Sequence, residues 1–148
     1  MANLVWVQPT FDRTLADVEY AKQQLEKNIN DVDFKGCFNV IDMVRIENDA
    51  QYLADALNDL YYRNNITTQI AWSTSSTPNV TNIVRIIDNV NKLMSAYHKP
   101  NDVPTLPTTL LTYEQANALE KNLYLIKQML DNMIASFREC GSFNCGEG

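Results

Sequence analysis

The sequence predicts an all-α fold, a bundle of about four helices in a single domain of 148 residues. A helical motif that begins at Asn39 recurs at Asn79, with Asn-Val at its start, Val-Arg-Ile at its centre and Leu near its end. A weaker third copy begins at Thr112 and has Ala118 at the Arg position. Apolar residues follow each start at the alternating spacing of a helix packing seam. Each copy must bury this stripe against its neighbours, so the repeat indicates a module of packed helices.

The first elements are an extended arm and a helix. Residues 1–13 are predicted to form the arm, in which valines flank Trp6. The first helix begins at the Thr14 cap, where Asp17 completes a capping box, and continues to about Asn30.

The three copies of the motif predict the other helices, so that the helical repeats occupy residues 14–137. The second helix begins at the Asn39 cap and continues to about Tyr62. The third begins at the Asn79 cap, and the fourth begins at Thr112 with a capping box. The apolar stripe of the fourth helix consists of Ala116, Leu119, Leu123, Ile126, Leu130, Met133 and Phe137.

Two connectors are longer than is usual between helices of a bundle. Residues 64–78 are rich in Thr and Ser, and residues 98–111 contain prolines that forbid helix. The connectors either pack along the bundle as straps or reach for a partner. We expect straps, because the connectors carry apolar anchors: Trp72, Leu106, Leu110 and Leu111.

Residues 138–148 are predicted to form an extended C-terminal tail. Its residues alternate in a way that suits a short β-strand, which could pair with residues 4–8 or with a sheet of a neighbouring subunit. The sequence does not separate these two possibilities.

The cysteines do not predict a metal site. A structural zinc site needs four ligands at close spacing, whereas Cys37, Cys140, Cys145 and the single His98 are scattered. We expect reduced thiols, as in a cytoplasmic protein, and a disulfide between Cys140 and Cys145 stays possible.

Charge and hydropathy exclude several partners. The net charge is -6 and the pI is near 4.6, so a nucleic-acid backbone would be repelled. No apolar run is long enough to cross a bilayer, and the N-terminus lacks the pattern of a signal peptide. We therefore expect no nucleic acid and no membrane among the partners, and synthesis in a reducing cytoplasm.

The sequence does not predict an enzyme or a cofactor. His98 has no nucleophile beside it, and no phosphate-binding loop or metal-binding helix motif is present. Most acidic residues lie off the apolar stripes and are predicted to form solvated faces: Glu19, Glu26, Asp49, Asp55, Asp59, Glu114, Glu120 and Asp131.

Four residues stand out as candidates for an interaction or as markers of the module. Arg45 and Arg85 occupy the same position in two copies; they could clamp a ligand carboxylate or pair within the chain, for example with Asp42. We expect the second role, since the feature is repeated. Trp6 and Trp72 each precede a proline and a capped helix, so we expect a repeated structural device and not an exposed interface.

The sequence resembles a group of small proteins encoded by tailed phages and prophages of Gram-positive bacteria. The resemblance covers nearly the whole chain. It rests on Trp6-Val-Gln-Pro-Thr10, Arg13-Thr-Leu-Ala-Asp-Val18, Asn39-Val-Ile-Asp-Met-Val-Arg-Ile-Glu-Asn48 with Tyr52-Leu53, Trp72, Val84-Arg-Ile86 and Cys145-Gly-Glu147.

This resemblance implies a virion structural protein of the tail, baseplate or tail fibre, which acts by assembly and attachment and has no catalytic residues. The expected partners are other virion proteins and further copies of the chain, since a long stripe can also serve a partner helix. The rival hypothesis is an acidic cytoplasmic adaptor or inhibitor that binds a basic protein. A third is a carbohydrate-binding tip that uses Trp72, Tyr61 and Tyr62.

Overall fold

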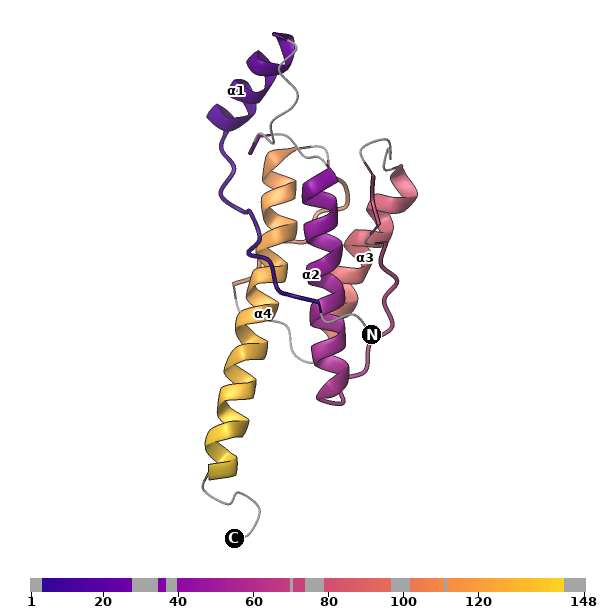
Figure 1. Cartoon of the computed structure of the whole chain (residues 1–148), viewed down its shortest axis with the longest axis vertical. Coiled ribbons are helices and arrows are strands. Elements are labelled where there is room, and N and C mark those ends of the chain that lie inside the picture. The colour runs from indigo at the N-terminus through magenta and orange to yellow at the C-terminus, as the bar shows by residue number, and fades with distance from the viewer. Residues whose placement is uncertain are drawn as a thin grey trace.

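The computed structural model confirms the predicted all-α bundle (Figure 1). It describes residues 4–27, 35–36, 40–69, 71–73, 79–96, 102–110 and 112–142, the side chains of 138–142 excepted. The helices are α1 (Leu15–Glu26), α2 (Val40–Asp59), α3 (Val80–Ala96) and α4 (Tyr113–Ser142). The residues described contain no strand.

The core lies between α2, α3 and α4, which pack against one another. The predicted stripes of these helices point inward within the bundle, because residues three and four apart share one helix face. The prediction is wrong for the end of the α4 stripe, where Phe137 is 54% exposed. Burial of this apolar surface is the main stabilising contribution to the fold. The largest completely buried apolar side chains are Met43, Ile46, Leu53, Leu57, Ile86, Leu93, Leu119, Leu123, Ile126 and Leu130.

The three core helices run parallel, and this orientation explains the long connectors. In Figure 1 each helix begins at the end near α1 and descends, and the chain then returns along the outside of the bundle. The 20 residues of α2 span about 30 Å at 1.5 Å per residue, so an extended return needs about nine residues or more. Short loops could join only antiparallel neighbours.

The described parts of both connectors are straps along the bundle, as predicted. Ile66 and Trp72 of the first, and Val103, Leu106 and Leu110 of the second, pack against the core. The N-terminal arm is a third strap, through which Trp6 also reaches the core. The bundle therefore consists of three units, each an extended strap followed by a helix, and α1 is inserted between the first strap and its helix.

Helix α1 stands apart from the bundle, beyond the starts of α2 and α4 (Figure 1). It begins with the predicted capping box, in which Thr14 and Asp17 exchange side-chain and backbone hydrogen bonds. The turn at Gly36 packs on its first turn. A Cβ at Gly36 would lie 2.2 Å from the carbonyl oxygen of Asp17, so only glycine fits this approach.

Capping also fixes the starts of α3 and α4. Asn79 and Asn82 donate their backbone amides to each other's side chains, both at 2.9 Å. Thr112 and Gln115 form the same reciprocal pair. These exchanges satisfy amides that a helix start leaves free, as the sequence predicted.

Helix α2 ends at Asp59, before the predicted end at Tyr62. The amide of Tyr62 donates to the carbonyl of Leu57 at 2.9 Å, while Tyr61 adopts a positive φ of 68°. This bond and this φ define a Schellman turn, in which glycine usually occupies the left-handed position. The sequence has no glycine here, so the end of the helix carried no signal.

The predicted extended tail is wrong for its first residues, because α4 continues to Ser142. No proline interrupts this helix. Residues 4–8 run along α2 instead of pairing with a terminal strand. The rest of the tail, Asn39, Cys37, Cys145, His98 and Leu111 lie outside the described residues, as does the side chain of Cys140.

Candidate functional site

A buried carboxylate, Glu120 of α4, joins three parts of the chain. Arg45 of α2 donates to it twice, through Nε at 2.7 Å and Nη2 at 3.0 Å. Arg13 of the arm lies 2.7 Å from its second oxygen, and the backbone amide of Thr10 donates to its first at 3.1 Å. We call Glu120, Arg45, Arg13, Asp42 and the Thr10 amide the Glu120 clasp. It fixes the arm across α2 and α4.

Asp42 balances the charges of the Glu120 clasp. It lies 2.5 Å from Arg45 and 3.0 Å from Arg13, so two guanidinium groups face two carboxylates. Buried ion pairs stabilise a fold only when hydrogen bonds satisfy most of their polar atoms, which is the case here. Burial alone would lower the pKa of Arg45, but its bonds to Glu120 and Asp42 outweigh burial and hold that pKa above its ordinary value.

A second buried carboxylate, Glu47 of α2, makes the equivalent contacts. Arg85 of α3 binds both of its oxygens, with Nη2 at 3.1 Å from Oε2. The backbone amide of Gln69 donates to it at 3.1 Å, and the indole Nε1 of Trp72 donates to Oε2. We call Glu47, Arg85, Trp72 and the Gln69 amide the Glu47 clasp. It fixes the strap across α2 and α3 at Gln69 and Trp72.

The two clasps follow the sequence repeat. Glu47 and Glu120 occupy the same position of the motif, as do Arg45 and Arg85. The Arg of one copy thus reaches the Glu of the adjacent copy, first from α2 to α4 and then from α3 to α2. A third pair would join α4 to α3. Its two positions hold Ala118 and Ile87, so this step of the pseudo-threefold arrangement is apolar.

A second polar position binds the straps in all three copies. Asp49 accepts from the amide of Val7 at 3.0 Å. Asn89 accepts from the amide of Thr67 at 3.3 Å and donates to its carbonyl at 2.6 Å. Asn122 donates to the carbonyl of Pro104 at 3.2 Å. Asp49, Asn89 and Asn122 are equivalent in the motif, and all are buried. They satisfy strap backbone that has no partner strand.

Asp49 differs from the two asparagines in charge. It is completely buried, and its Oδ2 has no hydrogen-bond partner among the described residues. Burial raises the pKa of Asp49 from 3.8 to about 7, against the bonds from Val7 and Asn48 that lower it. An amide at this position could donate where the second carboxylate oxygen does not.

Arg45 and Arg85 pair within the chain, as their repetition predicted, and the predicted pair of Asp42 and Arg45 is confirmed. Their partners Glu120 and Glu47 were not predicted. The prediction of solvated faces is wrong for Glu120 and Asp49, which are both fully buried. Partners that lie 75 residues apart, as Arg45 and Glu120 do, leave no local spacing signal. A signal did exist in the recurrence of Glu at the same motif position.

Trp6 and Trp72 do not occupy equivalent positions in their straps, although equivalent roles were expected of them. Trp72 donates to Glu47, and the matching donor to Glu120 is Arg13, three residues after the anchored amide in each strap. Trp6 lies 5.9 Å from the ring of Tyr52, and the ammonium of Lys127 lies 5.7 Å from the Trp6 ring. Each Trp ties its strap to the bundle.

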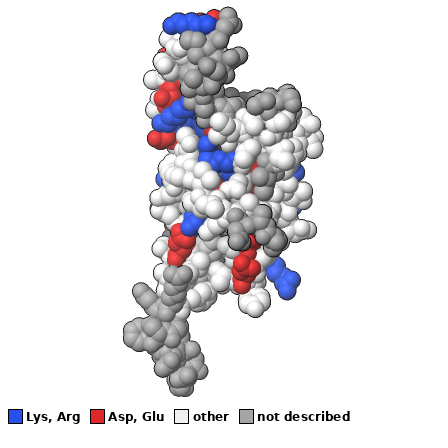
Figure 2. Space-filling model, in the orientation of Figure 1, with Lys and Arg blue, Asp and Glu red and all other residues white. Residues whose placement is uncertain are grey.

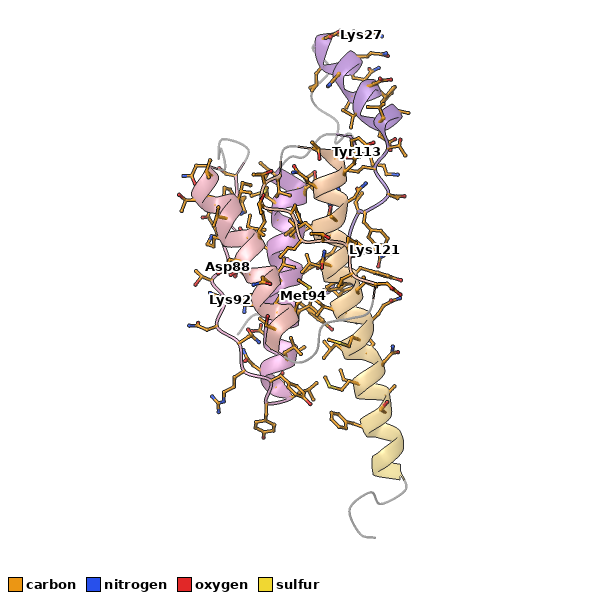
Figure 3. All side chains as sticks on the ribbon, turned by 180° about the vertical axis from the view of Figure 1, so that it is seen from behind. Lys27, Asp88, Lys92, Met94, Tyr113 and Lys121 are labelled. Atoms are coloured by element: carbon orange, nitrogen blue, oxygen red, sulfur yellow. The ribbon has the colours of Figure 1, made fainter. Side chains whose placement is uncertain are left out.

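The arm has one more aromatic anchor, on the outer face of α4. The ring of Phe11 lies 5.0 Å from that of Tyr124, and the ammonium of Lys121 lies 4.6 Å from the Phe11 centroid. Figure 3 shows Lys121 on the side of α4 along which the arm passes. Contacts of this kind stabilise exposed sites by about 0.5–1 kcal/mol each.

Charged groups on the surface are mixed. On the face in Figure 2, basic and acidic side chains lie near one another and form no large patch of one sign. Among the described residues, no group of three His, Cys, Asp or Glu is placed to hold a metal ion. No helix in the described part of the chain is long and apolar enough to cross a membrane.

The clasps are thus sites of assembly within the chain, in which helix side chains recognise extended backbone. Comparisons of the chain with protein-family models, with curated proteins and with solved structures found no match.

Proposed function

We propose that this chain is a structural protein of a tailed-phage virion, a rigid helical module for assembly and attachment in the tail, baseplate or fibre. One observation carries the proposal. Motif residues that underlie the resemblance to phage proteins are the residues that hold the straps to the bundle: Arg13, Asp42, Arg45, Glu47 and Asn48. We infer that the motif encodes the packing of the straps on the helices, and therefore the shape of the bundle.

The shape suits a part that joins neighbours. Helix α1 projects from one end of the bundle, and the last turns of α4 project from the other (Figure 1). At about 1.5 Å per residue, the 30 residues of α4 span about 45 Å, half as long again as α2. We propose that other virion proteins, and further copies of this chain, dock at these ends. Repetition around a symmetric particle would turn weak contacts into avidity.

The test is quantitative mass spectrometry on gradient-purified phage particles after a high-salt wash. A virion part stays with the particles at a fixed ratio to the major tail protein that matches the particle's symmetry. An acidic adaptor is held by charge and is released by salt. Absence from washed particles, with abundance in the lysate, would contradict the proposal and favour the adaptor.

Two phage variants sharpen this test, because they change one glutamate each in α4. Glu120 is fully buried in its clasp, whereas Glu114 is exposed. Phage with Glu120→Ala should lose the protein from washed particles, since the bundle no longer holds its arm. Phage with Glu114→Ala should keep it. Equal retention of the two variants would show that incorporation does not depend on the clasped shape.

A further inference from the structure

Tyr61 combines two properties that a structural role does not explain. Its side chain is 86% exposed, the highest exposure of any large hydrophobic residue described. Its φ of 68° lies in the left-handed region, which a bulky residue adopts only at a cost. Glycine would close the same turn without that cost. The turn therefore retains an aromatic ring in solvent, at the end of the bundle away from α1.

The ring borders a hollow lined by planar polar groups. This hollow has a volume of about 610 Å³ and is lined by Asn58, Tyr61, Arg63, Asn64 and Asn65. A second hollow of about 420 Å³ shares Arg63, Asn64 and Asn65 with the first. Both hollows are shallow and open to solvent, so a ligand would lie on the surface and keep one side in water.

The second hollow continues the first onto α3. Asn91, Lys92, Ser95 and Ala96 complete its lining. Figure 3 shows Lys92 on the outer side of α3, beside Asp88, with which it pairs at 3.1 Å. The two hollows together form a groove over the ends of α2 and α3.

The chemistry of this groove matches a glycan. Amide side chains both donate and accept, as sugar hydroxyl groups require, and arginine and lysine add donors. An exposed tyrosine supplies a flat, rigid contact face at a low cost in conformational entropy. No carboxylate lines either hollow, and Ala96 is the one aliphatic residue in their linings. A protein partner would be expected to find more apolar anchors.

We propose that this groove binds a glycan, with a sugar ring stacked on Tyr61 and hydroxyl groups bonded to Arg63 and Asn65. Asn64 fixes the backbone of the groove. Its side-chain amide donates to the carbonyl of Ala54, and its backbone amide donates to the side-chain oxygen of Asn58, both at 3.1 Å. Trp72 and Tyr62 take no part. Trp72 is engaged by Glu47, and Tyr62 packs against the core.

The test is saturation-transfer NMR with the full chain and millimolar glucose, galactose, N-acetylglucosamine and glucuronic acid. Sorbitol, a linear polyol without a sugar ring, is the ligand control. We expect transfer to at least one of the ring sugars and none to sorbitol. Absence of transfer to all four sugars would overturn the proposal.

The decisive variant is Tyr61→Gly, because glycine suits the backbone at this position and the variant should fold at least as well as the parent. We expect its affinity for the sugar to fall by about tenfold or more, and Tyr61→Trp to keep it. Tyr20→Ala, which removes an exposed tyrosine from α1, should leave binding unchanged. Equal binding by Tyr61→Gly and the parent would overturn the proposal. Neither result bears on particle association, so this inference and the virion proposal fail separately.

Discussion

Glu47 and Glu120 occupy equivalent positions in two helices, and each binds an arginine of an adjacent helix and a backbone amide of a strap at 3.1 Å. The two carboxylates hold together segments that are 22 to 110 residues apart in the chain. Extended returns along a parallel bundle leave backbone groups without a partner strand, and these two carboxylates bind one strap amide each.

Loss of Glu120 should destabilise the protein strongly. Glu120→Ala leaves Arg13 and Arg45 buried with one carboxylate between them, and breaking a buried ion pair costs about 3–5 kcal/mol. Urea unfolding of the variant and its parent gives this difference. Glu114→Ala, exposed on the same helix, should change the free energy of unfolding by less than about 0.5 kcal/mol. A similar cost for both variants would show that the clasp contributes little.

Asp49 should make stability depend on pH. The folded state raises its pKa from 3.8 to about 7, so the folded state binds this proton more tightly than the unfolded chain does. The resulting stabilisation is fully present below pH 3.8 and is lost as the pH rises to about 7. Above that pH, the carboxylate stays charged in both states and the effect is constant.

Asp49→Asn removes this titration and should stabilise the protein at neutral pH. The equivalent position of α3 already holds an amide, that of Asn89. The free energy of unfolding, measured for both proteins from pH 4 to pH 8, should show the advantage of the variant growing up to about pH 7. A difference that does not change with pH would mean that Asp49 titrates alike in the folded and unfolded states.

Tyr61→Gly should stabilise the protein, although it removes a side chain and introduces a glycine. The left-handed φ of 68° destabilises the folded state by about 1–2 kcal/mol for tyrosine but not for glycine. The greater freedom of glycine in the unfolded chain offsets part of this gain. A thermal melt should show a higher Tm. A lower Tm would show that the exposed ring contributes to packing at the end of α2.

The missing third ion pair can be tested by restoring it. Ile87→Glu alone should destabilise the bundle, since it places an unpaired charge at a buried core position. Ala118→Arg in the same chain should recover part of the loss, with a coupling energy of about 0.5–3 kcal/mol in a double-mutant cycle. Strictly additive effects would contradict the pseudo-threefold relation among α2, α3 and α4.

The sequence predicted the features that depend on residues close together in the chain, namely the helix caps and the apolar stripes. The caps at Thr14, Asn79 and Thr112 lie where they were expected, because each is set by residues three positions apart. The apolar stripes identified the core for the same reason. The end of α2 was misjudged, since Tyr61 occupies a position where glycine is the usual signal.

The clasps depend on the tertiary arrangement, so the local sequence pattern does not predict them. A buried glutamate and a solvated one have the same local pattern, and Glu120 meets the arm 110 residues away. The parallel direction of the helices was not predicted either, although connectors too long for a hairpin were consistent with it. The sequence did contain one signal. Glutamate recurs at the motif position of Glu47 and Glu120, and a short polar residue recurs at the position of Asp49, Asn89 and Asn122.

Amide hydrogen exchange by NMR tests most directly whether the straps are built into the bundle. The amides of Val7, Thr10, Thr67 and Gln69 lie in extended backbone, and each donates to a helix side chain. We predict that all four exchange slowly in the parent protein, and that Glu120→Ala selectively exposes Thr10 while Gln69 stays protected. Exchange of these amides at the rates of an unfolded peptide in the parent protein would contradict the account of a clasped parallel bundle.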